Sequence, residues 1–276
     1  MDNMTIYKEL KRFIDILDNS DKYINTVDYL IDEVEDVEDS KDYYFDQYEV
    51  AHALAHLDVE QIMCTEVESF VMEIYKEEIE NGNTNAMCEL AMMYYHGYRG
   101  IKQNFDQAVK YNLMAAEKGS EQAFENLGYC YYYGRGGIVD YAKALSYFLH
   151  GVLTGNSVSL YKIGDMYFNG YIVEKDPEFA MELYNTCIEM AEDMKVYDDR
   201  ILGPVYLRIA RMYHYGIGTN QDTDMALKMY HKAEMHLYQL ITEFYDFRFI
   251  QSYDEARSGL ETIADDLDDE IPVFEW

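Results

Sequence analysis

Four stretches in the middle of the chain share one pattern of apolar, small and polar positions. Each contains an anchor tyrosine, with an apolar residue four positions before it, a small residue three positions before it and a glycine three positions after it. The anchors recur every 36 to 37 residues, except for about ten extra residues before the fourth, within residues 192–204. This register indicates an internal repeat. The anchors are Tyr94, Tyr131, Tyr167 and Tyr213.

Each repeat predicts two antiparallel helices. In the first helix, apolar or small residues recur at every fourth position, as in Ala86, Leu90 and Tyr94. The glycine after the anchor suits the left-handed conformation that ends a helix. A polar N-cap then begins the second helix, and Pro177 follows one such cap at the first helical position. The caps are Asn104, Asp140, Asp176 and Asp222.

Small residues in both helices allow the two helices of a repeat to approach closely. In the second helix they stand four residues after the cap, at Ala108, Ala144, Ala180 and Ala226. A single hairpin of this kind cannot bury its apolar face alone, so the hairpins must stack. The sequence therefore predicts an all-α protein, a right-handed α-solenoid of helix-turn-helix repeats with helical caps at both ends.

These columns resemble the Sel-1-like repeat, a relative of the tetratricopeptide repeat. The segments 123–134 and 209–218 match its pattern directly, and the resemblance covers about residues 83–240. Two positions depart from it, because Ile172 stands where a second loop glycine is usual and Cys187 replaces a second-helix alanine. The resemblance implies a non-enzymatic scaffold that binds proteins or peptides, in a family found mostly in bacteria.

The ends of the chain predict further helices outside these four repeats. Residues 1–42 are expected to form an acidic N-terminal helical cap, with helices near 5–17 and 22–34. Residues 43–82 resemble a degenerate leading repeat, with helices near 48–57 and 60–80. Residues 241–276 are expected to form a C-terminal helical cap, with a helix over 253–267, and an acidic tail. That tail either folds back through residues 271–276 or serves as a docking peptide.

The net charge is concentrated at these ends. The chain has 276 residues, 53 of them acidic and 22 basic, for a formal charge of −31. Residues 1–80 carry −17 and residues 241–276 carry −9, whereas the middle carries only −5. The hydrophobic share of 49% excludes an acidic disordered chain. The charge argues against direct binding to nucleic acid or to an anionic membrane, and an acidic outer surface suits the end units of a solenoid.

The sequence also predicts a cytoplasmic protein. No basic and apolar leader is visible at the N-terminus, and no uncharged window reads as a membrane span. The four cysteines show no CxxC spacing, which is typical of reduced thiols.

A protein-binding groove is predicted on the first helices. In the related superhelical families these helices line the concave face. Positions −5, −1 and +2 relative to each anchor share one helix face. They combine polar groups with Met, Cys or aromatic residues, which suits an adaptable peptide site. The residues are Glu89, Met93 and His96; Asn126, Cys130 and Tyr133; Lys162, Met166 and Asn169; and Arg208, Met212 and Tyr215.

Other chemistry is less well supported by the sequence. His52, His56 and Glu60 have the spacing of metal ligands on one helix face, but they lack an HExxH motif, so a packed or surface histidine pair is favoured. The loop of residues 134–137 is rich in glycine but lacks a Walker lysine, which favours a repeat loop. No catalytic spacing and no cofactor motif is found.

A second function hypothesis places the contact at the charged ends. In it, the protein is an acidic inhibitor or immunity-type protein that occupies a basic site on a toxin, nuclease or effector. Such binding is expected to be sensitive to salt, whereas binding in the groove is expected to survive high salt.

Overall fold

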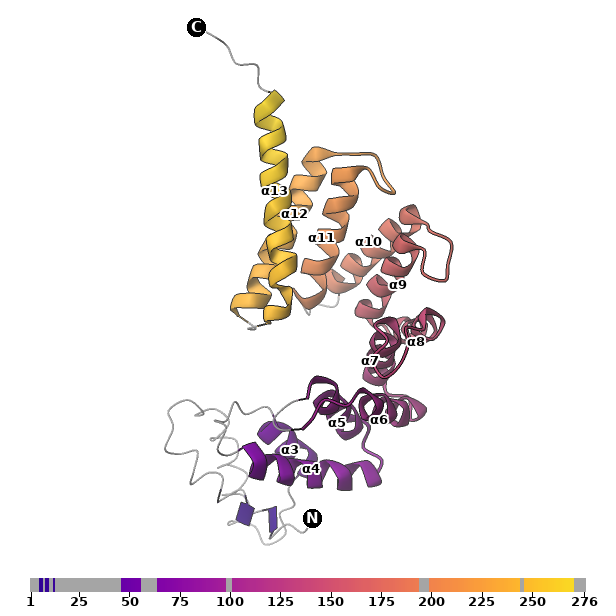
Figure 1. Cartoon of the computed structure of the whole chain (residues 1–276), viewed down its shortest axis with the longest axis vertical. Helices are drawn as coiled ribbons and strands as arrows, with labels where there is room; N and C mark the ends of the chain where they lie inside the picture. The colour runs from indigo at the N-terminus through magenta and orange to yellow at the C-terminus, as the bar shows by residue number, and fades with distance from the viewer. Residues whose placement is uncertain are drawn as a thin grey trace. The chain divides into compact units, whose positions relative to one another are not determined.

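In the part of the chain that the computed structural model describes, helices are the regular secondary structure, joined by short loops (Figure 1). The predicted all-α fold is confirmed. Most of the helices expected near residues 5–17 and 22–34, and the tail of residues 271–276, lie outside the described part. The described residues are 5–6, 8–9, 12, 46–55, 64–97, 101–193, 199–243 and 246–270.

The chain divides into two compact units, residues 1–139 and residues 140–276, and the division falls inside the second repeat. The helices described in the first unit are α3 (Gln47–Ala55), α4 (Cys64–Glu80), α5 (Thr84–His96), α6 (Phe105–Glu117) and α7 (Glu121–Tyr132). Those described in the second are α8 (Tyr141–Leu153), α9 (Ser157–Asn169), α10 (Pro177–Asp193), α11 (Asp199–Tyr215), α12 (Thr223–Thr242), the 3-10 turn η1 (Phe247–Phe249) and α13 (Ile250–Glu270).

The helix ends form where the repeat pattern predicts them. The side chains of Asn104, Asp140 and Asp222 each accept a hydrogen bond from the backbone N–H three residues on. Asp176 does the same for the N–H of Phe179 at 2.9 Å. These bonds satisfy donors that the first turn of a helix leaves unpaired. The glycines after the anchors have positive φ angles between 63° and 75°.

Small residues bring the helices of a repeat together, as predicted. The second-helix alanines at 108, 144, 180 and 226 are all fully buried. In the third repeat, a Cβ atom added to Gly164 of α9 would lie 2.6 Å from the ring of Tyr184 on α10. The backbone of α9 is therefore in contact with that ring, and a larger residue at position 164 would push the two helices apart.

The second glycine of the repeat loop contacts the preceding repeat. A Cβ atom on Gly218 would lie 2.6 Å from the backbone of Pro177, and one on Gly136 would lie 3.2 Å from the carbonyl oxygen of Phe105. Ile172 occupies this position in the third repeat and takes the same left-handed conformation, with φ of 63°. A β-branched residue is strained there.

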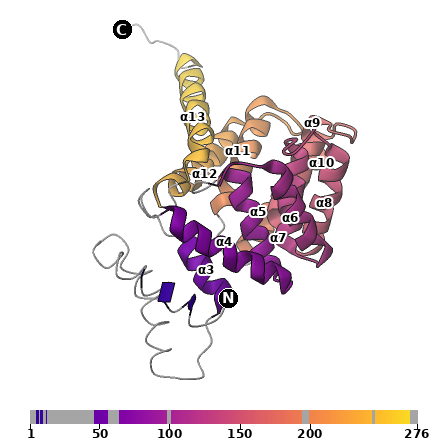
Figure 2. The ribbon, with the colours of Figure 1, turned by 60° about the horizontal axis from the view of Figure 1, so that its bottom comes forward.

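The last helix, α13, packs along α12 in both ribbon views (Figures 1 and 2). It begins three residues earlier than predicted, at Ile250. Ala256 and Ile263 are buried within the second unit, and Gly259 lies directly against the ring of Tyr230 on α12. The C-terminal end of α13 extends past the N-terminal end of α12 (Figures 1 and 2).

None of the described helices is both long enough and apolar enough to cross a bilayer. Among the residues that the structure describes, Cys88, Cys130 and Cys187 are buried and form no disulfide.

Candidate functional site

The three rows of predicted groove residues have different environments in the structure. The row at position −1 consists of Met93, Cys130, Met166 and Met212, and each of these side chains is at most 6% exposed. The prediction that they line an open groove is wrong, because position −1 lies three residues after the buried apolar residue of the repeat and shares its face. Burial also raises the pKa of the Cys130 thiol to about 11. This row belongs to the core.

The row at position −5 links neighbouring helices by polar contacts. In the first unit, Asn126 on α7 donates a hydrogen bond to the side chain of Asn112 on α6, at 3.1 Å. Asn112 is buried and in turn donates to the carbonyl oxygen of Ala108. Glu89 on α5 lies 3.8 Å from His52 on α3. These contacts connect α6 to α7 and α3 to α5.

In the second unit the same row is cationic and joins a buried charged network. Arg208 on α11 donates two hydrogen bonds to the carboxylate of Asp165 on α9, one of them at 2.8 Å and the other from Nε. The hydroxyl of Tyr184 on α10 donates to the same carboxylate at 2.8 Å. Lys162 lies 3.4 Å from it, and both cations lie over the ring of Tyr161. Three helices therefore meet at one carboxylate.

The network keeps Asp165 ionised. Burial by itself would raise the pKa of its carboxyl group, but the charge and hydrogen bonds of Arg208 reverse the effect, and the pKa lies below its ordinary value. The pKa of Arg208 is raised well above its ordinary value, because the attraction of Asp165 outweighs the effect of burial. Burial and then the Asp165 charge raise the pKa of Tyr184. Four donor groups, two from Arg208 and one each from Tyr184 and Lys162, face the carboxylate of Asp165. The role of this network is to hold the helices together.

The row at position +2 is exposed in every repeat. His96 and Asn169 are exposed, and the side chains of Tyr133 and Tyr215 are 48% and 62% exposed. These residues end the first helices, so they lie at one end of each hairpin. The aromatic members present large apolar rings to solvent.

Neighbouring rings support the exposed rings of this row. Tyr133 stacks on Tyr129 at 6.0 Å between centroids and meets the edge of Tyr132 at 4.9 Å. Tyr215 stacks on His214 at 4.4 Å. His214 is buried and lies 3.2 Å from the hydroxyl of Tyr230. Such contacts restrict rotation, so less side-chain entropy is lost when a partner binds.

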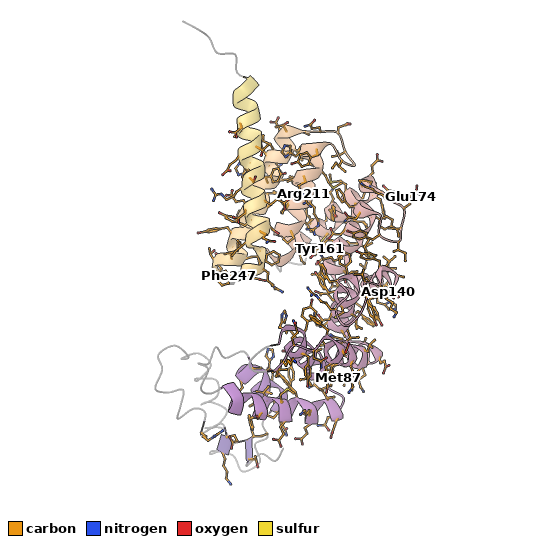
Figure 3. The ribbon with its side chains drawn as sticks, in the orientation of Figure 1. Met87, Asp140, Tyr161, Glu174, Arg211 and Phe247 are labelled. Carbon is orange, nitrogen blue, oxygen red and sulfur yellow. The ribbon has the colours of Figure 1, made fainter. Side chains whose placement is uncertain are left out.

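Figure 3 labels two residues of the second unit, Tyr161 and Arg211, that lie on first helices. Tyr161 lies on α9 at the charged network, and Arg211 lies on α11 where it faces α13. Arg211 bonds Glu255 of α13 at 2.9 Å. Of the exposed row, Tyr215 therefore stands on a helix, α11, that is tied by side-chain bonds to α9 and to α13.

The structure describes the glycine-rich loop and, of the three candidate metal ligands, His52 alone. His52 stacks on Tyr48 at 5.7 Å, while His56 and Glu60 lie outside the described residues. In the described part of the chain, no three His, Cys, Asp or Glu side chains gather in a way that could hold a metal ion. The glycine-rich loop of residues 134–137 follows helix α7, as expected of a repeat loop.

Successive helical hairpins, with small residues at their contacts and capped second helices, define a helix-turn-helix repeat protein. The Sel1 repeat model matches residues 84–120, 125–149, 157–186 and 204–236. The chain therefore carries four Sel1 repeats, and residues 84–236 belong to the Sel1 repeat family.

Two curated proteins illustrate the relationship. Human protein sel-1 homolog 2 is 31% identical over 120 residues, which cover 44% of this chain and 17% of that protein. The Arabidopsis thaliana protein HRD3B, an ERAD-associated E3 ubiquitin-protein ligase component, is 33% identical over 111 residues, covering 39% of this chain and 17% of its own length. The chain thus spans less than a fifth of the length of these relatives.

Solved structures show the same fold. A Sel1 repeat protein from Oxalobacter formigenes superimposes with a TM-score of 0.52 and 20% identity, covering 79% of this chain and 87% of its own. A protective antigen of uropathogenic Escherichia coli that displays an SLR fold gives a TM-score of 0.52 and 21% identity, covering 79% of this chain and 46% of its own. These likenesses establish the α-solenoid fold class and nothing about activity.

Proposed function

We propose that this chain is a non-enzymatic scaffold or adaptor that binds a protein or peptide segment at the exposed ends of its first helices. The observation that carries the proposal is the row at position +2. Tyr133 and Tyr215 are exposed at equivalent repeat positions, and each stacks on a neighbouring ring. Aromatic residues that are exposed and already ordered are typical anchors of protein interfaces.

The polar row at position −5 supports these anchors rather than contacting the partner directly. Lys162 is buried, and Arg208 is engaged by Asp165. The buried row at position −1 packs in the core and so holds the first helices in place. HRD3B is a component of an ERAD-associated E3 ubiquitin-protein ligase, which agrees with a role in assembly.

Site-specific photo-crosslinking tests this proposal. A photoreactive phenylalanine, close to tyrosine in shape, replaces Tyr133 or Tyr215 in the full chain expressed in its native host. The matched controls carry it at Glu117 on α6 and at Glu182 on α10, which are exposed second-helix positions. We expect a discrete partner from each tyrosine position and none from the controls. Equal labelling from the controls, or no discrete partner from either tyrosine position, would contradict the proposal.

The purified partner then separates this proposal from an acidic inhibitor. Replacing Tyr133 and Tyr215 by serine is expected to weaken binding at least tenfold, about 1.4 kcal/mol or more. The melting temperature is expected to stay unchanged, because the two rings are exposed. Binding is expected to survive high salt. If salt or neutralisation of residues 32–39 abolishes binding while the serine variants do not, the acidic ends make the contact instead.

A further inference from the structure

The corner between α12 and α13 exposes an apolar surface that the repeat pattern does not explain. Four large side chains are exposed there, by 57% at Met235, 55% at Tyr238, 62% at Phe247 and 42% at Ile250. We call these four residues the corner patch. Figure 3 places Phe247 at the end of the hairpin, where α12 turns into α13.

The patch is continuous across the two helices. Met235 and Tyr238 lie one turn apart on α12, and the Tyr238 ring lies 6.0 Å from the ring of Tyr253 on α13. Ile250 precedes Tyr253 by one turn on the same side of α13. Phe247 is in the 3-10 turn that joins the helices. Exposed apolar surfaces of this kind mark interaction sites more often than isolated exposed residues do.

An acidic stripe continues from the patch along α13. Ile250, Asp254, Glu261 and Asp265 follow one another by steps of four, seven and four residues, which places them on one helix face. All four are exposed. Arg257 lies 3.8 Å from Glu261, and Arg248 is held by Asp246 at 2.6 Å. The stripe therefore has apolar groups at its start and carboxylates along its length.

The charge around the patch selects the kind of partner. Residues 241–276 carry a net −9, so a second copy of this chain would bring like charge against like charge. Nucleic acid and anionic membranes are repelled for the same reason. A helical protein segment with bulky apolar residues on one face and Lys or Arg beside them is complementary to both the corner patch and the acidic stripe.

We infer that the corner patch and the acidic stripe of α13 form a docking surface for a basic amphipathic helix of a partner protein. This surface is separate from the exposed ends of the first helices, and it does not depend on the function proposed for them. Apolar anchors of the partner contact Phe247 and Ile250, and its basic residues contact Asp254, Glu261 and Asp265.

The probe is a fluorescein-labelled synthetic helix of leucine and lysine, 15 residues long, titrated with the full chain and followed by fluorescence anisotropy. A leucine–glutamate helix of the same pattern is the peptide control. The patch variant carries Phe247→Ser and Ile250→Ser, and the stripe variant carries Asp254→Asn, Glu261→Gln and Asp265→Asn. Matched exposed controls carry Leu149→Ser with Leu153→Ser on α8, and Glu117→Gln, Glu121→Gln and Glu182→Gln.

We expect the leucine–lysine helix to bind and the leucine–glutamate helix not to bind. The patch variant should raise Kd at least tenfold and the stripe variant at least threefold, while both controls stay within twofold of the native chain. Circular dichroism checks that each variant keeps its helix content. If the patch variant loses helix content, Met235→Ser replaces it as the test of the corner patch.

Three results would overturn the inference. One is the absence of binding to the native chain. Another is an equal loss in the control variants, which would mean general attraction to an acidic protein. The third is a native dimer, seen by sedimentation, that Phe247→Ser with Ile250→Ser dissociates, because the patch would then be covered by a second copy.

Discussion

The same repeat position, −5, has different partners in the two units of this protein. In the first unit, Asn126 meets Asn112 through one neutral hydrogen bond between α6 and α7. In the second, Arg208 meets Asp165, to which the Tyr184 hydroxyl also donates, so that α9, α10 and α11 are joined. The same repeat position therefore connects different helices in the two units, and the side chain that stands there sets the kind of contact.

The largest expected effect comes from breaking the charged network. Arg208→Ala leaves the carboxylate of Asp165 buried without its main partner, which typically costs about 3–5 kcal/mol. Asn126→Ala is the matched change in the first unit, and we expect it to cost about 1–2 kcal/mol. Urea unfolding of the full chain followed by circular dichroism measures both. Equal losses from the two variants would mean that the charged network holds its helices no more strongly than the amide pair does.

Acid is expected to weaken the second unit through the same carboxylate. The folded-state pKa of Asp165 is lowered by Arg208, so this group contributes stability above its ordinary pKa and loses it as the pH falls toward the folded value. The stability difference between the native chain and Asp165→Asn should therefore shrink below about pH 4. Unfolding free energies measured from pH 7 down to pH 2 follow it. A difference that stays constant over this range would show that Asp165 has an ordinary pKa.

Substitutions of the loop glycines are expected to give a smaller difference in unfolding free energy between the two units. Gly218→Ala places a Cβ atom 2.6 Å from the backbone of Pro177 at a φ of 70°, so we expect a loss of about 2–3 kcal/mol. Gly136→Ala has the same left-handed conformation but a Cβ contact of 3.2 Å, for an expected loss of about 1–2 kcal/mol. Thermal unfolding ranks the two variants, and the reverse order would show that the loop of the second unit relaxes freely.

The smallest effect is a gain in stability. Ile172→Gly removes the left-handed strain of a β-branched residue that is 60% exposed and buries little apolar surface. After the entropy cost of glycine in the unfolded chain, we expect a gain of about 0.5–1 kcal/mol. Ile172→Ala, which keeps a Cβ atom, is the control and should gain less. A loss of melting temperature in the glycine variant would mean that the isoleucine side chain packs usefully.

The spacing of the repeat predicted the helices, their caps and their close contacts, because these depend on local sequence. The caps at Asn104 and Asp222 and the buried alanines follow from residue type and position alone. The sequence did not predict which of the rows at positions −5, −1 and +2 are buried, since burial depends on how neighbouring helices cover the face of the first helix. The signal was present at position −1, where only Met and Cys occur and both are usually buried.

The charged network could be predicted only in part. Lys162 and Asp165 have the i, i+3 spacing of a helical pair, but the contact of Asp165 with Arg208 joins residues 43 positions apart. That distance in sequence spans the extra segment before the fourth repeat, so no local pattern reports it. The two rings that support Tyr133 belong to Tyr129 and Tyr132, so the tyrosines that immediately precede Tyr133 in the sequence were a visible sign of them.

The central claim is that the first-helix ends bind a partner while the buried row at position −1 only supports them. Hydrogen–deuterium exchange of the full chain, with and without the partner captured through position 133 or 215, tests this most directly. We predict added protection at the C-terminal ends of α5, α7, α9 and α11, in the segments 93–97, 130–134, 166–170 and 212–216. Protection confined to the second helices α6, α8, α10 and α12 would contradict the claim.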